Sequence, residues 1–116
     1  MVKPENHISF DDFLKVDIRV GKIVRAEPYP EARRPAFKVW VDFGSEIGIL
    51  KSSAQITVHY AIEDLPGMLV AGVVNFPPKQ IGKFMSEFLL LGFPDENEAV
   101  VLMQPNKVVP LGGRLF

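Results

Sequence analysis

The stretch from Asn75 to Ser86 carries side chains of the kinds that hold an extended polymer. It mixes cations, apolar side chains and short polar groups, and it follows an apolar run that ends at Val74. Pro77 and Pro78 lack a backbone N–H and fix φ near about −65°, so the loop is stiff and leaves the sheet at a fixed place. This composition favours a binding loop, although a plain β-hairpin connection would have the same pattern. The side chains that we expect the loop to present are Lys79, Lys83, Phe84, Met85, Ser86 and Glu87.

A second group of cations lies between residues 19 and 38. The whole chain has thirteen Lys plus Arg and fourteen Asp plus Glu, a formal net charge of −1, so it is not a strongly basic protein. One face can still be locally positive, although ordinary lysines on a solvated strand would give the same pattern. The cations of this segment are Arg19, Lys22, Arg25, Arg33, Arg34 and Lys38.

No combination of residues predicts catalysis or metal binding. The chain has no cysteine, which excludes disulfides, a thiol nucleophile and thiolate metal sites. His7 and His59 have no metal-ligand spacing, and no serine lies in a nucleophile motif or beside a base. Neither a Walker loop nor the glycine motif of dinucleotide-binding folds is present. We therefore predict a binding module that is not an enzyme and needs no cofactor.

A short helix is predicted to begin after Ser9. Ser9 suits the N-cap, and Asp11 and Asp12 would lie in the first turn, where the helix dipole favours negative charge. Phe10 and Phe13 would form part of its apolar side. Because so short a helix is marginal by itself, we expect it to cover an open end of the fold or to meet a second subunit.

The first strand is predicted from Asp17 to Ala26. Alternation places Ile18, Val20 and Val24 on one face and directs the cations outward. Gly21 in its middle indicates a bulge or a tight bend, as a strongly coiled strand of a small barrel requires.

Five further strands and one helical segment complete the predicted fold. The strands are expected at 37–43, 47–51, 68–74, 88–91 and 98–103, with a short helix or turn between 58 and 66. Six short strands without crossover helices favour an all-β Greek-key barrel of the OB type over a parallel α/β sheet. Such barrels bind ligands on the strand 2–3 face and between the loops that join strands 1–2 and 4–5.

The chain of 116 residues is predicted to be one domain. Its longest apolar runs, about seven residues, are far below the roughly 20 that span a bilayer, and the first seven residues contain no hydrophobic leader. We therefore expect a cytoplasmic protein without membrane insertion. The apolar C-terminal stretch 108–116 is expected to be held against the fold.

Four motifs in order resemble the CsaA family of export-related chaperones, over nearly the whole chain. They are Asp17-Ile-Arg-Val-Gly21, Glu31-Ala-Arg-x-Pro35, Lys51-Ser-Ser-Ala-Gln-Ile-Thr57 and Val74-Asn-Phe-Pro-Pro78 followed by Ser86-Glu87. CsaA is part of the wider tRNA-binding OB-fold family, so the resemblance implies one domain of this type over 1–116. It also implies a homodimer with contacts from the N-terminal helix (1–14) and a C-terminal extension (105–116).

The function implied by the resemblance is binding of unfolded or precursor polypeptides before secretion, with the secretion machinery as a further possible partner. The peptide-binding residues carried over by position are Phe76, Phe84, Met85, Ser86, Gln55 and Lys51. In this interpretation Phe84 and Met85 are exposed apolar groups, and cations form the rim of their cavity.

The alternative function is binding of tRNA or another structured RNA. The cations of the rim, which would contact phosphates, are Arg19, Arg25, Arg33, Arg34, Lys38, Lys79 and Lys83. RNA-binding members of the wider family have Ser-x-Gly-Met where this chain has Ser86-Glu87-Phe88-Leu89. The added carboxylate of Glu87 would repel phosphate, so RNA is the second choice.

Overall fold

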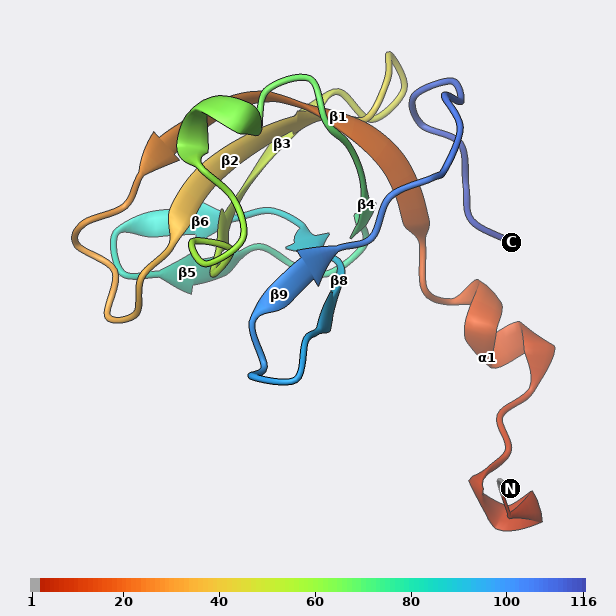
Figure 1. Ribbon diagram of the computed structural model, residues 1–116. Coiled ribbons are helices and arrows are strands. Elements are labelled where there is room, and N and C mark those ends of the chain that lie inside the picture. The colour runs from red at the N-terminus through yellow and green to blue at the C-terminus, as the bar shows by residue number, and fades with distance from the viewer. Residues whose placement is uncertain (1–2) are drawn as a thin grey trace.

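Strand β1 is the longest strand of the fold, and the barrel is built around it (Figure 1). The computed structural model describes residues 3–116; the first two residues of the predicted N-terminal segment 1–14 lie outside this range. The strands are β1 (Ile18–Pro28), β2 (Phe37–Asp42), β3 (Ile49–Ala54), β4 (Leu69–Val73), β5 (Lys79–Ile81), β6 (Phe84–Ser86), β7 (Leu89–Leu90), β8 (Gly92–Pro94) and β9 (Val100–Leu102). The helical segments are η1 (Pro4–Asn6), α1 (Phe10–Leu14) and η2 (Ile62–Asp64).

Five strands form one antiparallel sheet in the order β3-β2-β1-β4-β7. The sheet curls so that β3 meets the end of β6, where the Ser52 and Ser86 hydroxyls lie 2.9 Å apart. The Glu87 N–H donates to the Lys51 carbonyl, and the Lys51 N–H donates to the Glu87 carboxylate at 3.0 Å. The predicted OB-type barrel with one inter-strand helical turn is therefore confirmed.

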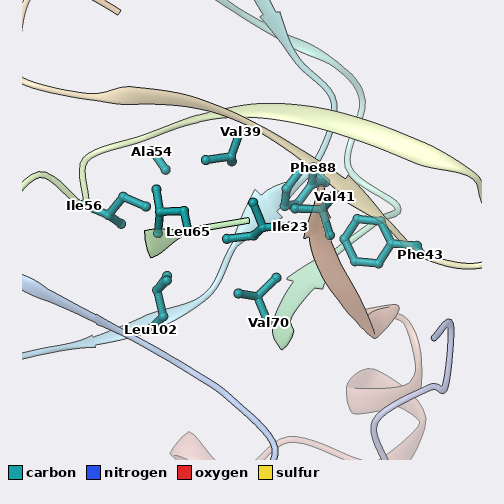
Figure 2. Packing of buried hydrophobic residues seen from close by; sticks show 10 residues of the cluster. All are labelled: Ile23, Val39, Val41, Phe43, Ala54, Ile56, Leu65, Val70, Phe88 and Leu102. Atoms are coloured by element: carbon teal, nitrogen blue, oxygen red, sulfur yellow. The ribbon is translucent and has the colours of Figure 1, made fainter. Parts of the chain in front are cut away.

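The barrel interior is filled by alternate residues of its strands (Figure 2). Val39 and Val41 of β2 are buried, and the residues between them face outward, as the period of two in a strand requires. Phe43 and Phe88 meet edge to face, with ring centroids 5.1 Å apart. The core thus consists of branched aliphatic side chains closed by an aromatic pair.

The faces of β1 differ from the prediction. Ile23 is fully buried, whereas Val24, predicted to share a face with Ile18 and Val20, is exposed. The pairing with β2 shifts between Ile23 and Arg25, so a bulge lies at this point. Gly21 permits the close approach of β1 to β2, because a Cβ at this position would lie 2.5 Å from the Val41 side chain.

From the third strand onward, the strand boundaries differ most from the prediction. The predicted loop 75–86 contains the β5–β6 hairpin, which is the alternative that its pattern left open. The third strand begins and ends later than predicted, at Ile49 and Ala54. β8 was not predicted, and it pairs with β9 in a separate hairpin. Short strands are hard to locate because each contains only one or two alternations.

The N-terminal helix α1 lies outside the barrel (Figure 1). The prediction of Ser9 as N-cap is confirmed, since its hydroxyl accepts from the Asp12 N–H while the Asp12 carboxylate accepts from the Ser9 N–H. No residue of α1 is buried, so α1 does not cover an open end of its own barrel. The side chain of Asn75 joins the two, because it donates to the Lys15 carbonyl and accepts from the Asp17 N–H.

Candidate functional site

The outer face of β2 and β3 is the place where most of the predicted site residues come together. Because Val39 and Val41 face the core, Lys38 and Trp40 of β2 face outward. Trp40 pairs with Lys51 of β3, and Lys38 pairs with Ser53. The pleat of two neighbouring strands therefore places two lysines and the only tryptophan of the sequence on one surface.

Phe84 is buried on this face, although the sequence predicted it to be exposed. Its relative exposure is 9%, because the β5–β6 hairpin packs its ring against Tyr29 and Trp40. The ring centroids lie 5.7 Å from Tyr29 and 6.1 Å from Trp40. Met85, the next residue, points away and is 40% exposed. The two apolar residues alternate along β6, so they cannot both line one exposed cavity.

Three cations lie against these aromatic rings. The ammonium nitrogens of Lys38 and Lys51 are each 5.2 Å from the Phe84 centroid, and Lys38 is also 4.8 Å from that of Tyr29. The Arg25 guanidinium lies 4.6 Å from the Trp40 centroid and pairs with Glu27. Ring faces carry partial negative charge and attract cations. The set formed by Arg25, Tyr29, Lys38, Trp40, Lys51 and Phe84 is called the cation–aromatic cluster below.

A polar hollow of about 410 Å³ lies beside the cluster. The β1–β2 loop contributes Arg33 and Arg34, whose side chains are exposed. Gln55 follows β3, and Gln80 lies on β5. The structure thus brings together three residues that the sequence assigned to the site, Arg33, Arg34 and Gln55.

A second hollow, of about 370 Å³, is lined mainly by apolar side chains, with Ser86 and Lys79 as its polar residues, and is called the apolar hollow. Phe76 and Leu89, which are 53% and 49% exposed, lie in its wall with Pro77 and Phe88. Lys79 is the cation of its lining. An apolar surface with one positive charge beside it therefore exists next to the predicted loop, but Phe76 contributes to it and Phe84 does not.

A third hollow, of about 310 Å³, is called the lysine hollow. Lys38 and Lys83 line it together with Tyr29 and Phe84. The predicted rim cation Lys83 is therefore part of the same outer face as the cation–aromatic cluster.

Ser86 and Glu87 have structural contacts. The Ser86 hydroxyl lies 2.9 Å from that of Ser52 and also donates to the Phe88 carbonyl. The Glu87 carboxylate accepts from the Lys51 N–H. Both side chains therefore take part in closing the barrel.

Arg19 lies apart from the other predicted site residues. Its guanidinium donates to Asp17 at 2.6 Å and to the Gly112 carbonyl at 2.9 Å. Six residues of extended strand separate it from Arg25, about 20 Å. The Arg19 hydrogen bond, opposed by partial burial and helped by the Arg19 and Arg114 charges, holds the pKa of Asp17 below its ordinary value. Arg19 is thus a structural residue and not part of the predicted rim.

Tyr29 and Trp40 were not among the site residues predicted from the sequence. Tyr29 is buried although it lies in a loop with a proline on each side, and its hydroxyl donates to the Ile81 carbonyl. An aromatic residue fixed between two prolines was the available signal. Over residues 3–116, no cluster of three His, Asp or Glu side chains fits a metal ion. No helix in this range has the length and apolarity to cross a membrane.

Comparison with known proteins places the chain in a family. Residues 18–114 match the family described as putative tRNA binding domain. The chain belongs to this family.

Solved structures of the chaperone CsaA are similar over nearly the full length. CsaA from Bacillus anthracis is 47% identical with a TM-score of 0.89, and the match covers 95% of this chain and 99% of that one. CsaA from Picrophilus torridus is 43% identical with a TM-score of 0.87, covering 95% and 100%. Within its family the chain therefore belongs with the CsaA proteins, as its motifs predicted.

Methionine–tRNA ligase of Thermococcus kodakarensis is similar to this chain over only a small part of its own length. It is 38% identical over 113 residues, which are 97% of this chain but 15% of the ligase. The chain thus corresponds to a small part of that enzyme.

Proposed function

We propose that this protein is a non-enzymatic chaperone that binds unfolded polypeptides. The apolar hollow beside Phe76 carries the proposal, because it offers exposed apolar surface next to a cation. Unfolded chains share exposed apolar side chains and no common shape, so such a surface suits them. The similarity to two CsaA chaperones over nearly their whole length supports this function.

Met85 adds an adaptable contact on the outer side of the hairpin. It is exposed, and a flexible thioether adjusts to ligands of different shape. The proposal therefore retains Phe76 and Met85 as polypeptide contacts and assigns Phe84 a different role, which is argued below.

The test is binding of a reduced, carboxymethylated model protein that stays unfolded. Phe76→Ser is expected to weaken binding about tenfold, because it removes a large exposed apolar surface. Phe93→Ser is the matched control, since Phe93 is 63% exposed and does not line the apolar hollow. Equal binding by both variants would reject the assignment of the hollow.

We also propose that the protein acts as a homodimer. Apolar side chains of the N-terminal segment, including Ile8 and Phe10, are exposed. A different hollow, of about 390 Å³ and also lined mainly by apolar side chains, lies between β1 and the C-terminal extension, with Val109 and Leu115 among its lining residues. A second copy would cover both surfaces. A deletion of residues 1–14 that left size and melting unchanged would count against this.

In the proposed role the clients are precursor chains held in the cytoplasm before export, and the secretion machinery receives them. The experiment measures competition for the protein between an unfolded precursor with its leader segment and the same unfolded chain without it, with the folded chain as a third competitor. Equal binding of the folded and the unfolded chain would contradict a chaperone role.

Binding of tRNA is the second candidate function. The exposed Arg33 and Arg34 beside the polar hollow favour it, because guanidinium groups pair with phosphates. The family described as putative tRNA binding domain adds support. The discriminating experiment titrates tRNA and the unfolded model protein in parallel at low and moderate salt. Phosphate contacts predict an RNA affinity that falls steeply with salt, whereas apolar contacts do not.

A further inference from the structure

The β5–β6 hairpin lies across the outer face of β2 and β3 and separates two hollows. The polar hollow and the lysine hollow both include Glu31 and Gly82 in their linings. Tyr29 lines the lysine hollow and Ile81 lines the polar hollow. The hydrogen bond from the Tyr29 hydroxyl to the Ile81 carbonyl therefore lies where the two hollows meet. If the tip of the hairpin moved away, the two hollows would join.

The hairpin is held differently at its root and at its tip. β5 and β6 pair with each other through three residue pairs and form a sheet of their own; a hairpin of this size is marginal without support. At the root, Ser86 and Glu87 tie it to β3. Toward the tip, the Tyr29–Ile81 hydrogen bond and the packing of Phe84 hold it down. The contacts that hold the tip are therefore separate from those that hold the root.

Phe84 occupies a site that is built to receive an aromatic ring. Tyr29 and Trp40 form the walls, and the ammonium groups of Lys38 and Lys51 lie over the ring. Across residues 3–116 neither lysine forms an ion pair with a carboxylate. The site therefore accommodates one aromatic ring. Its two lysine charges are available to acidic groups beside that ring.

We propose that the β5–β6 hairpin is a latch, and that the site now filled by Phe84 binds an aromatic side chain flanked by acidic residues in an unfolded polypeptide. The ligand part of this inference rests on the proposed chaperone function, whereas the latch itself does not. Opening releases Phe84, exposes Tyr29 and Trp40, and presents the two lysines to the acidic residues of the client. The affinity for such clients is reduced by the fraction of molecules in which the latch is closed.

Removing the Tyr29 hydroxyl tests the latch without a ligand. Tyr29→Phe keeps the ring but loses the hydrogen bond to Ile81, so the latch opens more often. Trp40 is the only tryptophan of the sequence and touches Phe84, so its quenching by acrylamide reports opening. We expect stronger quenching in Tyr29→Phe. Tyr60→Phe is the matched control, because its hydroxyl accepts from the Leu102 N–H elsewhere in the fold. Equal quenching in both variants would overturn the latch.

Gly82→Ala gives a second route to the open form. Gly82 has a φ of +64°, and an added Cβ would lie 2.6 Å from the Tyr29 hydroxyl oxygen, so alanine disfavours the closed hairpin. Its quenching is expected to change in the same direction as that of Tyr29→Phe. Hydrogen exchange of amides 79–84 should accelerate in both variants, while the core strands keep their protection. Unchanged exchange would contradict detachment of the tip.

Three synthetic peptides test the ligand class. The first has one phenylalanine between aspartates, the second has leucine in its place, and the third has lysines in place of the aspartates. Tyr29→Phe is expected to bind the first peptide two- to tenfold more tightly than the wild type, the range that one hydrogen bond supplies. The second and third peptides should bind Tyr29→Phe more weakly than the first peptide does. Equal binding of all three peptides would overturn the ligand class. So would an oligouridylate of matched charge that displaces the first peptide and binds more tightly than it.

Phe84→Leu separates this inference from a direct gripping role of Phe84. If Phe84 grips clients, the variant binds the first peptide more weakly; if Phe84 blocks the site, it binds more tightly. A melting curve verifies that the variant is folded, and Tyr29→Phe provides the same comparison without altering the core side of the hairpin. Stronger Trp40 quenching together with no binding of any unfolded chain would support the latch and reject the chaperone function.

Discussion

Arginines lie both at the start of strand β1 and in the loop that follows it, but the surroundings of these arginines differ. At the start of β1, Arg19 is bound by Asp17 and the Gly112 carbonyl, and Arg114 lies 3.7 Å from the same carboxylate. At the other end, Arg33 and Arg34 follow β1 and extend into the polar hollow, and within the described residues neither forms an ion pair. The arginines at the start of β1 hold the chain together, whereas Arg33 and Arg34 in the loop are available to a ligand.

This difference indicates what each end can bind. The start of β1 presents apolar surface whose two arginines, Arg19 and Arg114, are both paired with Asp17. This suits burial against a second copy, because burying a paired charge costs less than burying an unpaired one. The outer face of β2 and β3 presents Lys38 and Lys51 beside aromatic rings, and within residues 3–116 neither lysine forms an ion pair, which suits a ligand that brings negative charge. Similar residue types therefore have opposite roles, according to their partners.

Among variants that test this comparison, removal of residues 108–116 is expected to lower the stability most. The segment forms backbone hydrogen bonds to β1, from Gly112 to Val20, from Val20 to Gly113 and from Leu115 to Ile18. Their loss should lower the free energy of unfolding by about 3 kcal/mol and the melting temperature by roughly 10 °C. Light scattering should show loss of the proposed dimer. Deletion of the fully exposed Phe116 alone is the control for stability; an unchanged melt after the longer truncation would contradict the role of the extension.

Asp17→Asn should have the next largest effect, and the effect should depend on pH. The hydrogen bond from Arg19 lowers the pKa of Asp17 below its ordinary 3.8 in the folded state. A lowered carboxylate pKa contributes stability that is present above the unfolded-state pKa and is lost as the pH falls through the folded-state pKa. We expect a difference of about 1 kcal/mol between wild type and variant at pH 7, which shrinks as the pH falls below 3.8 and is lost once the pH has passed the folded-state pKa.

Urea unfolding of both proteins across this range measures that difference. Asp11→Asn is the matched control, since its carboxylate is exposed in the first turn of α1. Asp12 and Asp95, whose pKa values are also lowered by hydrogen bonds from Ser9 and His59 respectively, are present in all three proteins and cancel. A gap that persists at low pH would show that the carboxylate charge is not responsible.

The double variant Arg33→Ala, Arg34→Ala should have the smallest effect on stability while changing any RNA binding. Two exposed cations without ion pairs contribute little to folding, so the melting temperature should move by less than about 2 °C. The slope of log affinity for tRNA against log salt should fall by about two, one phosphate contact per arginine. The control is Lys22→Ala, Lys107→Ala, two exposed lysines outside the polar hollow. An unchanged slope would remove these arginines from the RNA surface.

The sequence by itself determined the barrel and the surface that its outer residues form. Alternation along 37–43 fixed which residues of β2 face the core, because the period of a strand leaves no choice once one face is apolar. Ser9 and Asp12 fixed the start of α1, since both hydrogen bonds of that cap are local. The four motifs were sufficient to predict the CsaA relationship.

Only the tertiary structure decided which of the expected site residues are available to a ligand. Phe84 and Phe76 look alike in sequence, yet one ring is covered by Tyr29 and Trp40 and the other is exposed. Arg19 and Arg33 look alike too, yet one is held by Asp17, which lies two residues earlier, and by Gly112, which lies 93 residues away. The physical reason is that exposure and pairing depend on contacts between distant segments, whereas periodicity and capping depend on neighbours in the chain.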